Sequence, residues 1–147
     1  MQISSALPHS FEGAQLNILL QNAQKLIEDN LHKLSKTIEQ SFSGDEFTGG
    51  SVGAWHNQNG TLNAHFVLFR VNNDDPIECI IHLSLTPGKA EVCADVCQQD
   101  GTILYSVGDF EFGYYEEKEL LAWLDSVCQS ANEGFLRYFS DLRLESK

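Results

Sequence analysis

Hydrophobic side chains recur every three to four residues from Phe11 to Phe42, which predicts one long amphipathic helix. Its apolar stripe consists of Leu16, Leu20, Ala23, Ile27, Leu31, Leu34, Ile38 and Phe42. The stripe follows a 3.6-residue period and leaves a strict heptad after Ile27, so we expect this helix to lie on a globular core and not in a coiled coil. Ser10 is the expected N-cap, and Gly44 occupies the place of a C-terminal glycine.

The middle of the chain alternates apolar and polar residues between turn signals, a pattern typical of strands. Five strands are predicted, at Val52–His56, Leu62–Val71, Ile77–Leu85, Ala90–Cys97 and Thr102–Phe112. Asn59-Gly60 indicates a hairpin of type I′, Gly49-Gly50 closes a linker, and Gly108-Asp109 marks a bulge in the last strand. Because every connection is short, neighbouring strands are expected to pair antiparallel as a meander.

A helical pattern returns at Glu116, with acidic residues in the first turn, where the helix dipole favours negative charge. Gly134 is expected to kink this helix or to split it. The predicted fold class is therefore α+β: a long N-terminal helix, a meander sheet of about five antiparallel strands and a C-terminal helix. We expect a single α+β domain over residues 1–147, with 1–10 as a flexible N-terminal segment.

Strand alternation separates two faces of the predicted sheet. One face is apolar throughout, from Leu62 to Val107 with Ile103 and Tyr105 included, and must be covered, which predicts a two-layer α/β sandwich with both helices on one face. The other face mixes acidic with apolar side chains, and Phe69 and Ile80 exposed there need an explanation. We therefore predict a partner-binding surface at His65, Phe69, Glu78, Ile80, His82, Glu91 and Asp95. The alternative is that the long helix, the linker or strand twist covers the apolar groups.

Acidic residues dominate the chain, whose formal net charge is −12 over 147 residues. Between Gly44 and Glu117 there are twelve acidic residues and two basic ones, so the acidity belongs mainly to the predicted sheet. This charge argues against nucleic acid and against anionic membranes. It serves solubility, or it attracts a basic protein partner.

The four cysteines are expected to be free thiols in a cytoplasmic protein, because the start of the chain lacks the features of a signal peptide and no stretch has the length of a membrane helix. Cys93 and Cys97 lie four residues apart in one predicted strand. That spacing separates them by roughly 13 Å, too far for a disulfide.

No residue pattern indicates a catalytic or cofactor site: P-loop, GxGxxG, GxSxG and HExxH motifs are absent from the sequence. His65 and His82 share a predicted face and lie opposite each other in one of two registers, where a divalent metal is conceivable but lacks a defined third ligand. Cys93 or Cys97 beside either histidine is a conceivable nucleophile, although nothing in the sequence orients the pair. No catalytic residue, metal or cofactor is therefore predicted.

In element order and charge, the chain resembles two groups of bacterial proteins: type III secretion chaperones, which bind effectors as dimers, and immunity proteins, which cap toxic nucleases with acidic surfaces. The chaperones carry a helix between their third and fourth strands, for which Thr86–Lys89 leaves no room. The resemblance implies an acidic protein-binding module, an immunity-type inhibitor or a chaperone for a basic protein. Two alternatives stay open: a small-ligand domain or enzyme with a pocket between helices and sheet, and a homodimer of unknown role.

Overall fold

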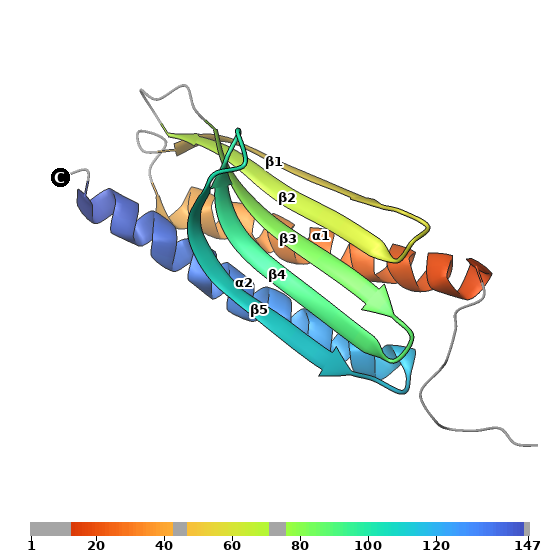
Figure 1. The fold of residues 1–147 in the computed structure, drawn as a ribbon. Coiled ribbons are helices and arrows are strands. Elements are labelled where there is room, and N and C mark those ends of the chain that lie inside the picture. The colour runs from red at the N-terminus through yellow and green to blue at the C-terminus, as the bar shows by residue number, and fades with distance from the viewer. Residues whose placement is uncertain (1–12, 43–46, 71–75, 146–147) are drawn as a thin grey trace, which may run out of the picture.

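The computed structural model describes residues 13–42, 47–70 and 76–145, which form two long helices and five strands (Figure 1). In chain order these elements are α1 (Gly13–Ser41), β1 (Phe47–His56), β2 (Thr61–Arg70), β3 (Pro76–Thr86), β4 (Lys89–Gln98), β5 (Ile103–Gly113) and α2 (Glu117–Glu145). The predicted element order is confirmed. Residues 1–10, with the expected cap at Ser10, and Gly44 lie outside the described residues. Neither described helix is apolar enough over its length to cross a membrane.

The sheet is an antiparallel meander with strand order β1-β2-β3-β4-β5. β1 begins at Phe47 and includes Gly49 and Gly50, which were predicted to lie in a linker. The hairpin predicted at Asn59-Gly60 is confirmed, but its predicted type I′ turn is wrong. The Gly60 N–H donates to the Asn57 carbonyl, and Asn57 N–H to the Thr61 carbonyl, so the loop has three residues, and the glycine at its end has a positive φ.

Both helices pack against the same face of the sheet, α1 under β1 and β2 and α2 under β4 and β5 (Figure 1). The alternate strand residues that point toward them are almost fully buried, as the pattern predicted: Leu62, Ala64, Phe66, Leu68, Ile77, Cys79, Ile81, Leu83, Leu85, Ala90, Val92, Ala94 and Val96. The predicted two-layer sandwich is confirmed.

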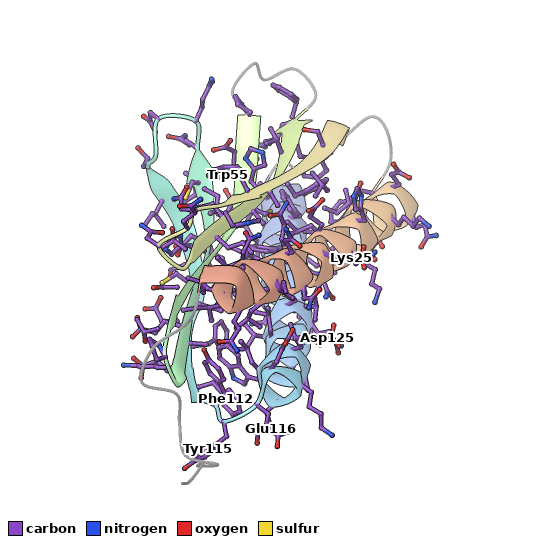
Figure 2. The ribbon with its side chains drawn as sticks, turned by 90° about the vertical axis from the view of Figure 1, so that its right-hand side faces the viewer. Lys25, Trp55, Phe112, Tyr115, Glu116 and Asp125 are labelled. Carbon is purple, nitrogen blue, oxygen red and sulfur yellow. The ribbon has the colours of Figure 1, made fainter. Side chains whose placement is uncertain are left out.

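The two helices run parallel to each other, joined by polar contacts along their seam. Asn22 Nδ2 donates to Glu117 Oε1 at 2.8 Å, and Asn30 Nδ2 donates to Asp125 Oδ1 at 3.0 Å. Figure 2 shows Asp125 on the side of α2 that faces α1. At 2% exposure, Asn30 is buried, and its carbonyl accepts a bond from Asn132 Nδ2 at 2.8 Å. These bonds give a buried amide its partners and fix the helices in one register.

The C-terminal helix is continuous through Gly134, so the predicted split is wrong, and the kink stays a prediction. A Cβ on Gly134 would lie 2.5 Å from Val107 Cγ1. Gly134 is therefore a place where the backbone of α2 approaches β5 closely. Glu119 Oε1 accepts bonds from the N–H groups of Tyr115 and Glu116, both at 2.9 Å, which satisfies donors at the start of the helix.

β5 carries two bulges, at Val107 and Leu104, where the pairing with β4 shifts by one residue. The prediction placed the bulge at Gly108-Asp109, next to the first of these. Because of the second shift, Ile103 pairs with Cys97 and is 59% exposed, so its predicted place on the covered face is wrong. Tyr105 and Val107 do pack against the core, and Tyr105 stacks on Tyr138 of α2.

Candidate functional site

The face of the sheet away from α1 and α2 is covered by none of the residues that the structure describes (Figures 1 and 2). We call it the open face and define it by the strand side chains that point away from the helices. They are Ser51, Gly53, Trp55, Thr61, Asn63, His65, Val67, Phe69, Glu78, Ile80, His82, Ser84, Thr86, Lys89, Glu91, Cys93, Asp95, Cys97, Ile103, Ser106, Asp109 and Glu111. All seven residues predicted as partner-binding belong to this set.

Strand register arranges the open face in rows that cross the sheet. One row contains His65, Ile80 and Asp95, and the next contains Asn63, His82, Cys93 and Asp109. Phe69 lies opposite Pro76, two rows from Ile80, with Val67 and Glu78 as the pair between them. The structure therefore separates Phe69 from Ile80 and places acidic side chains among the apolar ones.

His65 packs against β1 at a notch, the place where Gly53 has no side chain. The sequence did not indicate this contact. A Cβ on Gly53 would lie 2.7 Å from His65 Nε2, so the imidazole covers the bare backbone of that glycine. Trp55 meets the same ring edge-on, with 5.4 Å between centroids, and Glu78 Oε1 lies 3.7 Å from His65 Nδ1. With Trp55 half exposed, these residues form an aromatic and acidic corner of the open face. The strand register is needed to find this corner, because the sequence predicted only that Trp55 lies in a strand close to a turn.

His82 and His65 are not opposite each other, because His82 pairs with Asn63 and His65 with Ile80. Instead, His82 Nδ1 lies 2.7 Å from Asn63 Oδ1, within hydrogen-bond distance. Within residues 13–42, 47–70 and 76–145, no group of three or more His, Cys, Asp or Glu side chains has the geometry to hold a metal ion.

Cys93 lies directly between His82 on β3 and Asp109 on β5. A hydrogen bond to the Asp109 carboxylate, followed by burial, raises the pKa of the Cys93 thiol to about 11. Burial, and then Asp95 and Glu78, raise the pKa of the Cys97 thiol as well. A protonated thiol is a poor nucleophile, so this arrangement opposes the cysteine–histidine chemistry that the sequence left open.

Carboxylates outnumber bases on the open face. Glu78, Asp95 and Asp109 follow a diagonal over three strands, while Glu91 and Glu111 lie opposite each other. Lys89 Nζ bridges the second pair, at 3.1 Å from Glu91 and 3.6 Å from Glu111. Because the open face carries five carboxylates and one lysine, it has a net negative charge.

A pocket opens between α1 and strands β1 and β2, on the other side of the sheet. It is lined by Ser35, Ile38, Glu39, Phe42, Phe47, Phe66 and Leu68. Among the described residues that line it, Glu39 is the one titratable group, so these residues supply neither an acid–base pair nor a nucleophile with its base. Its chemistry suits an apolar group better than a reaction.

Comparison of the chain with protein-family models, with curated proteins and with solved structures gave no match. A functional assignment for this chain therefore rests on the geometry and charge of the open face.

Proposed function

We propose that this chain is a protein-binding module whose open face docks a basic protein partner. The observation that carries the proposal is the combination on one uncovered surface of five carboxylates with Trp55 and Phe69, which are 50% and 39% exposed. A sheet face that only meets water is expected to be evenly polar. Exposed aromatic groups rimmed by charge are typical of interaction sites.

The size of the open face suits a specific interface. Five strands at their usual spacing and about ten residues per strand cover roughly 600–700 Å². A standard interface buries about 800 Å² on each partner. A partner that covers this face and one of its borders would reach that size.

Charge favours a basic partner over a second copy of the chain. Two open faces laid together would bring five carboxylates against five, and like charges in contact cost free energy. Lysine and arginine side chains of a partner would instead meet Glu78, Asp95 and Asp109 and stack on Trp55. The chain's formal charge of −12 would also steer a basic partner toward it.

The test is affinity capture from the native cell extract, followed by binding of each purified candidate by calorimetry at several salt concentrations. Three forms of the full chain are compared: wild type, Trp55→Ser with Phe69→Ser on the open face, and Ile18→Ser, which changes an apolar side chain 53% exposed on α1. We expect a basic protein that binds wild type and Ile18→Ser equally and loses at least tenfold in affinity with the open-face variant.

A second comparison isolates charge. Glu78→Gln with Asp95→Asn removes two open-face charges, and Glu133→Gln with Asp141→Asn removes two from the exposed surface of α2. The proposal predicts slower association and weaker salt dependence for the first pair only. Equal effects of the two pairs would contradict it. So would light scattering that shows a wild-type dimer dissociated by Trp55→Ser with Phe69→Ser, because the open face would then serve self-association.

A further inference from the structure

The two edges of the sheet are built differently, and the difference concerns their backbone hydrogen bonds. In β1, the Asn57 N–H donates to the Thr61 carbonyl, and because antiparallel pairs alternate, the backbone groups of Val52, Ala54 and His56 point away from the sheet. In β5, the Tyr114 N–H donates to the Gly88 carbonyl. By the same alternation, the backbone groups of Asp109, Glu111 and Gly113 point outward.

Helix α1 closes the edge at β1. Gln24 Nε2 donates to the outward carbonyl of Ala54 at 3.2 Å, and Gln24 Oε1 lies 2.6 Å from His56 Nδ1. Asn17 Oδ1 holds the other ring nitrogen of His56 at 3.2 Å. An incoming strand would have to displace these contacts before it could pair with β1.

Helix α2 leaves the edge at β5 open. It packs beneath the strand through stacked rings, with Phe112 and Trp123 5.2 Å apart, and through Gly134 against Val107. Figure 2 shows Phe112 on the helix side of β5. Among the described residues, no group bonds to the outward backbone of Asp109, Glu111 or Gly113. Both bulges of β5 lie before this stretch, so Gly108–Gly113 is a regular strand.

Proteins normally guard such an edge with charged side chains, with proline or with a bulge. Gly108–Gly113 has only the carboxylates of Asp109 and Glu111, which repel acidic strands but leave the edge a template for a basic one. We infer that Gly108–Gly113 of β5 is a docking edge, which accepts an extended segment of the partner with basic residues at alternate positions as a sixth, antiparallel strand. The inference rests on the proposed function in taking a basic protein as the partner. It adds where the partner's backbone binds and which pattern its sequence has.

The side chains of Asp109 and Glu111 set this pattern. They rise on the open face from the residues whose backbones point outward, so a partner residue directly opposite would place its side chain beside them. Lysine or arginine at every second position satisfies both carboxylates. A second copy of β5 does not, because the antiparallel self-pairing that uses all three outward residues sets Glu111 against Glu111, and like charges directly opposite are destabilising.

The test uses a ten-residue peptide of alternating lysine and valine with blocked ends and a fluorophore. Anisotropy measures its binding to the full chain, and amide exchange followed by NMR locates it. The added strand predicts that the amides of Asp109, Glu111 and Gly113 gain protection at least tenfold. The intervening amides, which already bond to β4, stay unchanged. N-methylation of the lysine amides should abolish binding, because those amides face the edge when lysine lies opposite the acids, whereas N-methylation of the valine amides should be tolerated.

Variants of the chain complete the test. Glu111→Pro removes one outward N–H without breaking a bond to β4, a place where an edge strand tolerates proline. It should weaken the peptide at least tenfold. Glu111→Gln retains the N–H and should lose less affinity than Glu111→Pro. The inference is overturned if Glu111→Pro binds the peptide like Glu111→Gln, if both methylated peptides behave alike, or if the peptide does not bind.

The outcomes separate the two proposals. A partner or peptide that depends on Trp55 and Phe69 but ignores Glu111→Pro would sustain the proposed function and overturn the docking edge. Alternating protection at the three outward amides, with no partner sensitive to the open face, would sustain the docking edge and overturn the proposed function.

Discussion

Replacement of Gly134 by alanine should destabilise the protein, although alanine is the better helix former. In an unconstrained helix interior this change would stabilise by about 1 kcal/mol. Here the new Cβ would meet Val107 Cγ1 at 2.5 Å, Cγ2 at 3.1 Å and Cβ at 3.3 Å. Valine is stiff at χ1 and sits on a bulge of β5, so it has little freedom to turn away. Overpacking of this kind costs about 1–3 kcal/mol.

The expected net loss for Gly134→Ala is therefore about 1 kcal/mol, a fall of about 2–4 °C in Tm for a chain of this size. Urea and thermal unfolding followed by circular dichroism measure it. Val107→Ala removes the two nearest methyl groups, so Gly134→Ala with Val107→Ala should be more stable than the sum of the single changes, by about 1 kcal/mol. Ser130→Ala, at an exposed position of the same helix, is the control for propensity and should be neutral or mildly stabilising.

A different result would refute the reasoning about this contact. If Gly134→Ala raises Tm, the helix has room to move away from β5, and the glycine is not required by close approach. If the double variant shows no coupling, the cost arises from another part of the helix.

Two further predictions concern groups that the structure places in unusual surroundings. The hydrogen bond to Asp109 raises the pKa of the Cys93 thiol to about 11, so Asp109→Asn should lower that pKa. Cys93 should then react several-fold faster with Ellman's reagent at pH 8. An unchanged rate would show that the Asp109 carboxylate does not cause the raised pKa. Asn30→Asp should cost about 3 kcal/mol at pH 8, because the new carboxylate faces Asp125 in a buried seam. Burial and the charge of Asp125 raise the folded-state pKa of the new carboxylate at position 30. The loss relative to wild type should therefore shrink as pH falls from 8 to 4, while an Asn30→Ala control should show a constant difference.

Alternation and helical periodicity were sufficient for the layers of this fold, because burial of one face is a property of each element separately. The apolar residues of β2, β3 and β4 repeat every second position without interruption, so their face and its cover by two helices followed directly. β5 broke the rule at Leu104 and Val107, where a bulge is decided by pairing with β4 and leaves only a weak trace in the sequence. Ile103 was misplaced for this reason.

Contacts between elements were the part that the sequence could not supply. All seven candidate residues share the open face, yet the separation of His65 from His82, and of Phe69 from Ile80, depends on register. The notch at Gly53 and the close approach at Gly134 are likewise contacts across elements. A glycine in a strand or helix signals such a contact without naming the partner, which is why the sequence suggested a kink at Gly134.

The open face and the docking edge have one structural cause, the placement of both helices on a single side of a meander. With both 29-residue helices beneath the sheet, no described element remains for its upper side. Whether a helix closes an edge then depends on which face of the sheet carries the side chains of the residues whose backbone groups point outward. At β1 they point down, within reach of Gln24 on α1, and the edge is closed. At β5 they point up as Asp109 and Glu111, away from α2. The free backbone groups of β5 therefore lie beside the carboxylates of Asp109 and Glu111, and a single basic strand could bond to both kinds of group. Water can also bond to both, but it leaves Trp55 and Phe69 exposed.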